Sequence, residues 1–359
     1  MYLTPSLSAL FVTALFVFPS PSAADVPGQW PPLDQTPSLA PQWAALVNVS
    51  SIPNAPVQKK AAGDCSQTAV YCNWSCDNCK RPGDVTICPG QNDWGISYDD
   101  GPSTYTPALL DYLKKNNVTA TFFIIGSRAF ENPDILKRTV AEGHQIGVHT
   151  WSHPYLTTLT NEQIMAELKW TETIIKTITG ITPLYMRPPY GDVDDRVRSI
   201  ANQMGYKVTI WDVDTNDWLS DNNPKFNRAS ITNVIKKAVA KKSPTGHISL
   251  EHDLYPVAAA EAPKALDIIL KAGFAAKPVG TCLGTKFYVE DSNSTTPTPI
   301  INSTPTPSAT TNSATETTSA VPTATDSSQS DASLSTDYLS SFALFVTSTF
   351  CIMFFGLII

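Results

Sequence analysis

The chain has 359 residues, of which 42% are hydrophobic and 16% charged, and its formal net charge at pH 7 is −7. This length accommodates one large domain of about 200 residues with extensions at its ends. The acidic balance argues against nucleic acid as a partner, because binding phosphates requires an excess of Lys and Arg.

The first 24 residues have the pattern of a secretory signal peptide. Residues 7–18 form an apolar run that is too short to span a bilayer, and the small residues Ser22, Ala23 and Ala24 follow it. We expect cleavage near Ala24 and therefore an extracellular protein. A buried core helix is the alternative interpretation of the same run.

Cysteines mark the expected N-terminal extension, residues 25–93. Of the chain's seven cysteines, Cys351 would leave with the apolar C-terminal tail; five of the other six cluster in the extension and one lies far along the chain: Cys65, Cys72, Cys76, Cys79, Cys88 and Cys282. In an oxidising compartment an even count predicts disulfides, and the odd cluster requires one of its members to bridge to Cys282. A zinc knuckle at Cys76 and Cys79 is the alternative, although thiols of secreted chains are usually oxidised.

From Trp94 onward, short apolar runs alternate with helical patterns, and we expect residues 94–290 to form the main domain. The expected strands span residues 94–98, 119–125, 145–148, 184–186, 207–211, 247–251 and 277–279. The expected helices begin near Tyr105, Asp134, Asn161 (a candidate cap), Asp194, Ala229 and Glu261. Such alternation predicts a parallel α/β sheet, and about seven strands predict a distorted, incomplete (β/α) barrel.

Polar residues follow the points where these strands end. They are Asp99, Asp100, His149, Arg187, Asp212, Asp217 and His252. In parallel α/β barrels the carboxyl ends of the strands form one rim, where catalytic groups converge. We therefore expect a single site at this rim.

His149 and His153 are spaced so that both imidazoles can face one metal ion from a single turn or tight loop. This spacing alone is a weak signal, but the chain has only five histidines, and Asp99 and Asp100 end another strand. A His, His, Asp set leaves a coordination position open for water, as in catalytic zinc sites. Side chains of neighbouring strand residues point in opposite directions, so one aspartate can bind the metal while the other accepts a proton. The nitrogen and oxygen ligands suit zinc, with cobalt as the alternative.

Five segments of the main domain form an ordered set of motifs. They are Ser97-Tyr98-Asp99-Asp100-Gly101, His149-Thr-Trp-Ser-His153, Arg187-Pro-Pro-Tyr190, Asp214-Thr-Asn-Asp217-Trp218 and Leu250-Glu-His252. In this order they resemble the motifs of the polysaccharide deacetylases, carbohydrate esterase family four. The resemblance covers residues 94–284, with Ser-Tyr in place of the usual Thr-Phe and Glu251 inside the last motif. The whole chain is similar to GPI-anchored chitin deacetylases of basidiomycete fungi.

The resemblance implies a metal site and a base beside it. Asp100, His149 and His153 would hold one divalent ion. Asp99 would be the general base, and it would also contact the acetate product. Arg187 would orient this base and keep it ionised by its opposite charge.

The remaining motif residues would handle the substrate and the leaving group. His252 resembles the general acid, and Asp217 would favour its charged form. The main-chain N–H of Tyr190 would stabilise the oxyanion. Trp218 and Leu250 would line the pocket for the acetyl methyl group and sugar ring, with a plain core position as the alternative for Trp218.

The C-terminal part of the chain has the composition of a surface anchor. Residues 291–332 are rich in Ser, Thr and Pro, which predicts an extended, O-glycosylated stalk. Residues 333–359 combine a polar spacer with an apolar tail, the pattern of a GPI-anchor signal, with attachment expected at Ser330. An ordinary tail anchor is the alternative. N-glycosylation sequons lie at Asn48, Asn73, Asn117, Asn293 and Asn302.

These features predict a monomer that hydrolyses the N-acetyl groups of chitin, giving chitosan and acetate, at the outer face of the fungal plasma membrane and in the cell wall. Two alternatives stay open: an acetylxylan or other polysaccharide esterase, and a catalytically silent chitin-binding wall protein. A glycosidase is disfavoured, because it needs two carboxylates flanking a sugar but no histidine pair.

Overall fold

The computed structural model describes residues 26–59, 65 and 68–291. The chain divides into two units, residues 1–302 and 303–359, and every described residue belongs to the first. The expected signal peptide, the anchor signal, nearly all of the stalk, Asn293, Asn302 and Ser330 lie outside the described residues. Within those residues, no helix is long and apolar enough to cross a bilayer.

The described residues form one sheet of nine strands in the order β6-β5-β4-β3-β2-β8-β1-β9, with β7 paired to β8. The strands are β1 (Asp93–Gly95), β2 (Ser97–Asp99), β3 (Thr121–Ile124), β4 (Gln145–Val148), β5 (Tyr185–Met186), β6 (Lys207–Val208), β7 (Val213–Asp214), β8 (His247–His252) and β9 (Ala275–Lys277). Neighbouring strands pair in parallel. No pairing among the described residues joins β6 to β9, so the predicted incomplete barrel is confirmed.

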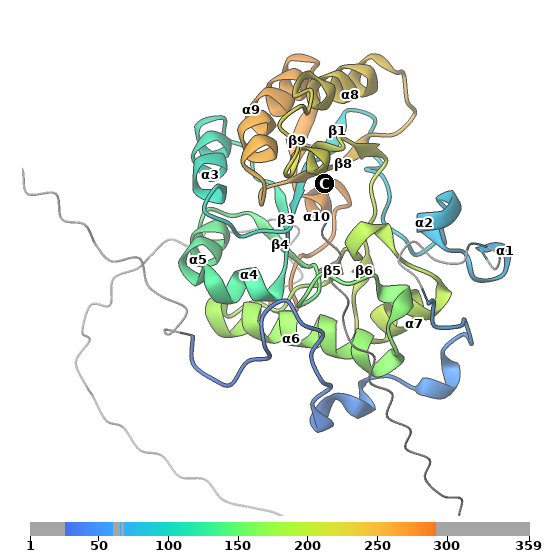
Figure 1. Cartoon of the computed structure of the whole chain (residues 1–359). Coiled ribbons are helices and arrows are strands. Elements are labelled where there is room, and N and C mark those ends of the chain that lie inside the picture. Colours follow the sequence, from blue (N-terminus) through green and yellow to red (C-terminus); the bar gives the residue numbers. More distant parts are fainter. Residues whose placement is uncertain (1–25, 60–64, 66–67, 292–359) are drawn as a thin grey trace, which may run out of the picture. The chain divides into compact units, whose positions relative to one another are not determined.

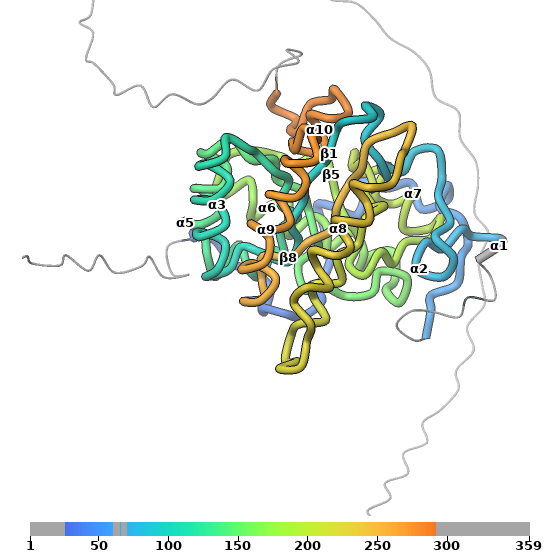
Figure 2. The backbone as a smooth tube through the Cα atoms, turned by 90° about the horizontal axis from the view of Figure 1, so that it is seen from above, coloured from blue at the N-terminus to red at the C-terminus, as the bar shows by residue number. Residues whose placement is uncertain are grey.

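Helices connect these strands and cover the outside of the sheet (Figure 1). They are α1 (Thr68–Tyr71), α2 (Trp74–Asp77), α3 (Thr106–Lys115), α4 (Gly126–Glu131), α5 (Pro133–Ala141), α6 (Asn161–Thr179), α7 (Asp195–Gln203), α8 (Ala229–Ala240), α9 (Pro256–Lys271) and α10 (Val279–Cys282). Helix α6 turns Ile164, Leu168 and Ile175 into the core. Helices α8 and α9 lie side by side (Figure 2).

The predicted strand at residues 94–98 proved to be two strands that change partners at Ile96. Strand β1 pairs with β8 and β9, whereas β2 pairs with β3 and β8. The N–H of Ile96 donates to Lys277 and its carbonyl accepts from Thr121, so this one residue bonds to two different strands. Strand β7 was not predicted, because its two residues leave no alternating pattern.

Three helix and strand boundaries also differ from the prediction. Asn161 does not cap α6; Thr160 does, in a capping box with Gln163. Helix α9 begins at Pro256, about one turn and a half before the predicted Glu261, because proline suits a first helical turn. Val279 starts α10 instead of ending a strand.

Three disulfides pair all six cysteines of the main unit: Cys65–Cys76, Cys72–Cys79 and Cys88–Cys282. The expected bridge from the cluster to Cys282 is therefore confirmed, and its partner is Cys88. Since Cys76 and Cys79 belong to different disulfides, the zinc-knuckle interpretation was wrong. The long-range bridge ties the segment before β1 to α10.

Candidate active site

Asp100, His149 and His153 meet at the carboxyl ends of β2 and β4. The carboxylate Oδ1 of Asp100 lies 3.3 Å from Nε2 of His149 and 3.2 Å from Nε2 of His153. The candidate ligand atoms of the three residues lie within 4.8 Å of one another. This mixed nitrogen and oxygen set suits a divalent ion such as zinc.

The electrostatics of Asp100 fit a bound cation. Within the described part of the chain its buried Oδ1 has no hydrogen-bond partner, and two imidazole nitrogens face it instead. Burial would raise the pKa of Asp100, but the neighbouring His153 and His149 outweigh burial and hold this pKa well below its ordinary value. The carboxylate is thus ionised, as a metal ligand must be.

Backbone and neighbours orient both imidazoles. Nδ1 of His149 lies 2.8 Å from the carbonyl of Arg187, so Nδ1–H donates there and Nε2 faces Asp100. Nδ1 of His153 lies 3.1 Å from Oη of Tyr190. His153 itself has φ 58, a left-handed conformation that turns its ring back toward Asp100.

Asp99 lies beside this cluster but makes different contacts. Its Oδ1 accepts a hydrogen bond of 2.8 Å from Nη1 of the fully buried Arg187, while Oδ2 lies 3.8 Å from Nε2 of His149. The guanidinium of Arg187 is held in turn by the ring of Phe123, 4.2 Å from its centroid. The two adjacent aspartates therefore have different partners, but strand alternation is not the cause: β2 ends at Asp99, and Asp100 has a left-handed φ of 78.

His252 approaches the cluster from β8, which pairs with β2 at this level. Its Nε2 lies 4.0 Å from Oδ2 of Asp100, and its Nδ1 lies 2.6 Å from Oδ1 of Asp217. Burial would lower the pKa of His252, but Asp217 outweighs it and raises the pKa to about 10. The imidazole is therefore charged and can give up a proton.

The remaining predicted residues lie around these groups. Leu250 on β8 is buried at 4% exposure, whereas Trp218 is 46% exposed, which argues against a plain core position for this tryptophan. Tyr190 is 48% exposed and has φ 59 within the 3₁₀ turn Pro189–Gly191. The side chain of Asp212, by contrast, pairs with His247 at the start of β8, away from the cluster.

Three residues around the site were missed by sequence reasoning. Tyr155 stacks on Tyr190 with centroids 3.9 Å apart, and the Tyr255 ring lies 6.0 Å from His252. Both tyrosines follow a motif histidine within three residues, and this proximity was the available signal. Glu167 of α6 accepts hydrogen bonds from the backbone between the two histidines, and nothing in the sequence marks it.

The sequons differ in their surroundings. Asn48 and Asn117 are exposed. Asn73 is buried, and its Oδ1 accepts from the N–H of Ser75 as the cap of α2. Glycosylation at Asn48 and Asn117 stays a prediction, and both side chains are accessible to it. A glycan at Asn73 would require this buried side chain to leave its position as the cap of α2.

In this open parallel α/β barrel, carboxylates and imidazoles converge at the carboxyl ends of the strands, where barrel enzymes place their catalytic groups. The family model described as "Polysaccharide deacetylase" matches residues 86–209. Chitin deacetylase 1 of Cryptococcus neoformans var. grubii is 41% identical over 310 residues, which cover 79% of this chain and 65% of that relative. The match thus spans slightly less than two thirds of that protein's length.

Two other comparisons cover a larger share of their counterparts. Chitin deacetylase 2 of Saccharomyces cerevisiae is 35% identical over 72% of this chain and 80% of its own length. The solved structure of the chitin deacetylase from Colletotrichum lindemuthianum aligns with a TM-score of 0.54 and 31% identity, covering 58% of this chain and 96% of that one. The chain belongs to the polysaccharide deacetylase family.

Proposed function

We propose that this protein is a metal-dependent chitin deacetylase, which hydrolyses N-acetyl groups of N-acetylglucosamine units and yields chitosan and acetate. The observation that carries the proposal is the placement of Asp99 and His252 beside one Asp-His-His cluster, 3.8 Å from a histidine and 4.0 Å from the aspartate of that cluster. A base and an acid are thus available to the same bound amide.

Asp100, His149 and His153 would hold the ion, which when bound would polarise the acetamide carbonyl and acidify the attacking water. Their nitrogen and oxygen donors favour zinc, with cobalt as the alternative. The three residues use one ligand atom each, which leaves room for water and substrate oxygen.

The chain's own residues then move the protons. Asp99 accepts a proton from the attacking water, and Arg187 holds its carboxylate in place. The peptide N–H of Tyr190 donates to the developing oxyanion. His252 passes a proton to the departing amine, and Asp217 keeps that imidazole charged until then.

The choice of chitin rests on the relatives that carry this name and on the exposed aromatic rings beside the cluster. The ring of Trp218 is exposed and offers a face on which a sugar ring can stack, and Leu250 would contact the acetyl methyl group. Acetylxylan is the alternative substrate, because an ester could enter the same site.

We further propose that the mature protein is a secreted monomer. The catalytic domain, residues 94–290, would stand on the Ser/Thr/Pro-rich stalk and be GPI-anchored at Ser330 to the outer face of a fungal plasma membrane, next to the cell wall. The composition of residues 291–359 supports this arrangement.

The proposed function is tested by acetate release from chitin oligomers of defined length and from acetylxylan. We expect release from the oligomers, its loss after chelation, and its return with zinc or cobalt. Activity that survives complete metal removal would exclude the metal mechanism, and release from acetylxylan alone would exclude chitin as the substrate.

A further inference from the structure

The loop that carries Tyr190 has an unusual backbone. Tyr190 and the following Gly191 have φ values of 59 and 65, so two consecutive residues are left-handed. A tyrosine adopts this conformation only when its surroundings impose it. The contacts that hold this loop therefore decide where the N–H of Tyr190 points.

The short helix α2 of the Cys-rich extension contacts the three residues after Tyr190 in turn. The Trp74 ring packs closely against Gly191: a Cβ atom added to Gly191 would lie 2.2 Å from Cζ3 of Trp74. The Ser75 hydroxyl donates to Oδ1 of the fully buried Asp192 at 3.1 Å. The backbone N–H of Trp74 donates to the carbonyl of Val193 at 3.0 Å.

Asp192 also connects this loop to the segment after His153. Its Oδ2 accepts from both the N–H and the hydroxyl of Thr157, each at 2.8 Å. Asp192 thus ties α2, the Tyr190 loop and the chain beyond the second histidine together with one carboxylate.

Trp74 also contacts a ring that leads toward the proposed base. The rings of Trp74 and Trp211 form an edge-to-face contact, with centroids 4.7 Å apart at an angle of 63°. The centroid of Trp211 lies 5.5 Å from Cζ of Arg187, whose Nη1 donates to Asp99. A continuous set of packed rings therefore runs from the extension to the Arg187–Asp99 pair.

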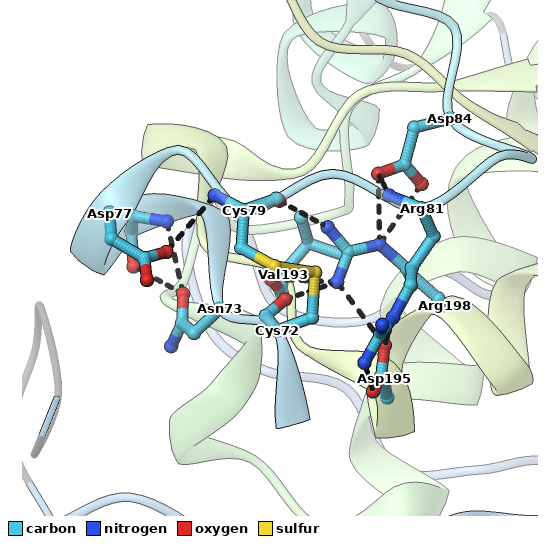
Figure 3. Close-up of a disulfide and its surroundings, with 10 residues drawn as sticks. Cys72, Asn73, Asp77, Cys79, Arg81, Asp84, Val193, Asp195 and Arg198 are labelled. Atoms are coloured by element: carbon cyan, nitrogen blue, oxygen red, sulfur yellow. Dashed lines mark hydrogen bonds and ion pairs between the residues drawn. A yellow bond between two sulfur atoms is a disulfide. The ribbon is translucent and has the colours of Figure 1, made fainter. Parts of the chain in front are cut away.

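Helix α2 has four residues and could not persist alone, so other groups must fix it. The Cys72–Cys79 disulfide closes the loop around it, and Cys65–Cys76 ties its third residue. Figure 3 shows the Arg198 guanidinium facing the carbonyls of Cys72 and Cys79, to which it donates, while its Nε donates to Asp84. The buried Arg198 thus fastens both ends of the disulfide loop to α7.

We infer that the disulfide-closed segment, residues 72–79, is a positioning element for the peptide N–H of Tyr190, with Trp74 as its positioning residue. The inference rests on the proposed function, because that N–H is assigned to the oxyanion there. An extension outside the barrel would then contribute to the reaction without touching the substrate. Since the oxyanion forms only in the transition state, a misplaced donor lowers kcat and leaves KM nearly unchanged.

The test compares Trp74→Ala with Trp43→Ala in the full chain. Trp43 is the matched control, because it makes a similar edge contact, 4.9 Å at 79°, with Trp170 of α6 instead of the Tyr190 loop. We expect Trp74→Ala to lower kcat about tenfold with KM changed less than about twofold, and Trp74→Phe to retain most of the rate. Zinc affinity should stay at the wild-type value in all three variants.

Hydrogen exchange of residues 187–193 provides a readout that does not depend on activity. We expect faster exchange there in Trp74→Ala and in the Cys72→Ser, Cys79→Ser double variant, but not in Trp43→Ala. Equal exchange in the two tryptophan variants would overturn the inference even if no substrate were turned over. Faster exchange with an unchanged kcat would overturn the catalytic part, whereas an inactive wild type would count against the proposed function alone.

Discussion

Asp217 binds His252 through both of its carboxylate oxygens: Oδ1 lies 2.6 Å from Nδ1 of the ring, and Oδ2 accepts from the backbone N–H of the same residue at 2.8 Å. One carboxylate therefore sets both the ring orientation and the charge of the proposed acid. The Asp212–His247 pair is similar at the start of β8: its ring contact is also 2.6 Å, but the backbone N–H that donates to Asp212, at 2.7 Å, belongs to the next residue, Ile248.

The first prediction concerns Asp217→Asn. The amide keeps the shape but removes the negative charge, so the raised pKa of His252 should fall. The protonated acid is present below its pKa and is lost as pH rises, so the alkaline limb of the pH–rate profile should move to lower pH. We expect kcat near neutral pH to fall about tenfold to hundredfold. Asp212→Asn is the matched control, and an equal effect of the two substitutions would contradict the assignment.

The second prediction separates the base from the metal ligands. Asp99→Asn should lower kcat by about a thousandfold, because the amide cannot accept a proton from water. Zinc content should stay near the wild-type value, since Asp99 lies beside the cluster and bonds to Arg187. Elemental analysis and acetate release on the same preparation check both statements. Loss of zinc in this variant would make Asp99 a ligand instead.

The third prediction concerns Glu167, which lies beneath the loop that joins the two histidines. Its Oε2 accepts from the N–H groups of Trp151 and Ser152 at 2.7 and 2.9 Å, and its Oε1 accepts from the Ser152 hydroxyl at 2.5 Å. Glu167→Ala should therefore weaken zinc binding about tenfold to hundredfold, as with other groups that orient ligands. Competition with a chelator measures this affinity directly.

Glu172→Gln is the control for this effect, because Glu172 is also buried on α6 but accepts its hydrogen bonds from Tyr206 and Lys169 instead of the ligand loop. We expect this control to lose stability without losing zinc affinity. The absorption spectrum of bound cobalt should change in Glu167→Ala only. If the cobalt spectrum is unchanged in both variants, Glu167 does not orient the loop that carries the two histidines.

The positions of Asp99, His149 and His252 could be predicted because each lies at the carboxyl end of a strand, and parallel strands bring these ends together. Glu167 and Trp74 could not, because their role depends on contacts between distant segments that leave no periodic pattern. Ile96 shows the same limit for the fold. A strand that changes partners at one residue has the same apolar alternation as an unbroken one.

The last prediction concerns stability at acidic pH and involves His144, outside the proposed site. Burial lowers the pKa of His144 to about 4, and its Nδ1 accepts the N–H of Ala120 at 3.1 Å, which only the neutral ring can do. Glu142 would raise this pKa and Arg138 would lower it, but both act less than burial.

The sign of this effect follows from the pKa in the two states. In the unfolded chain His144 binds a proton with its ordinary pKa of 6.5, whereas in the folded protein it does so only near pH 4. The stability that is present above pH 6.5 is therefore lost as the pH falls toward 4. His144 alone should cost about 2 kcal/mol of unfolding free energy between pH 7 and pH 5. His144→Asn, whose side-chain carbonyl can also accept a hydrogen bond, should flatten this dependence in urea unfolding measured at both pH values. An equally steep loss in the variant would place the acid sensitivity elsewhere, since asparagine has no proton to gain in this range.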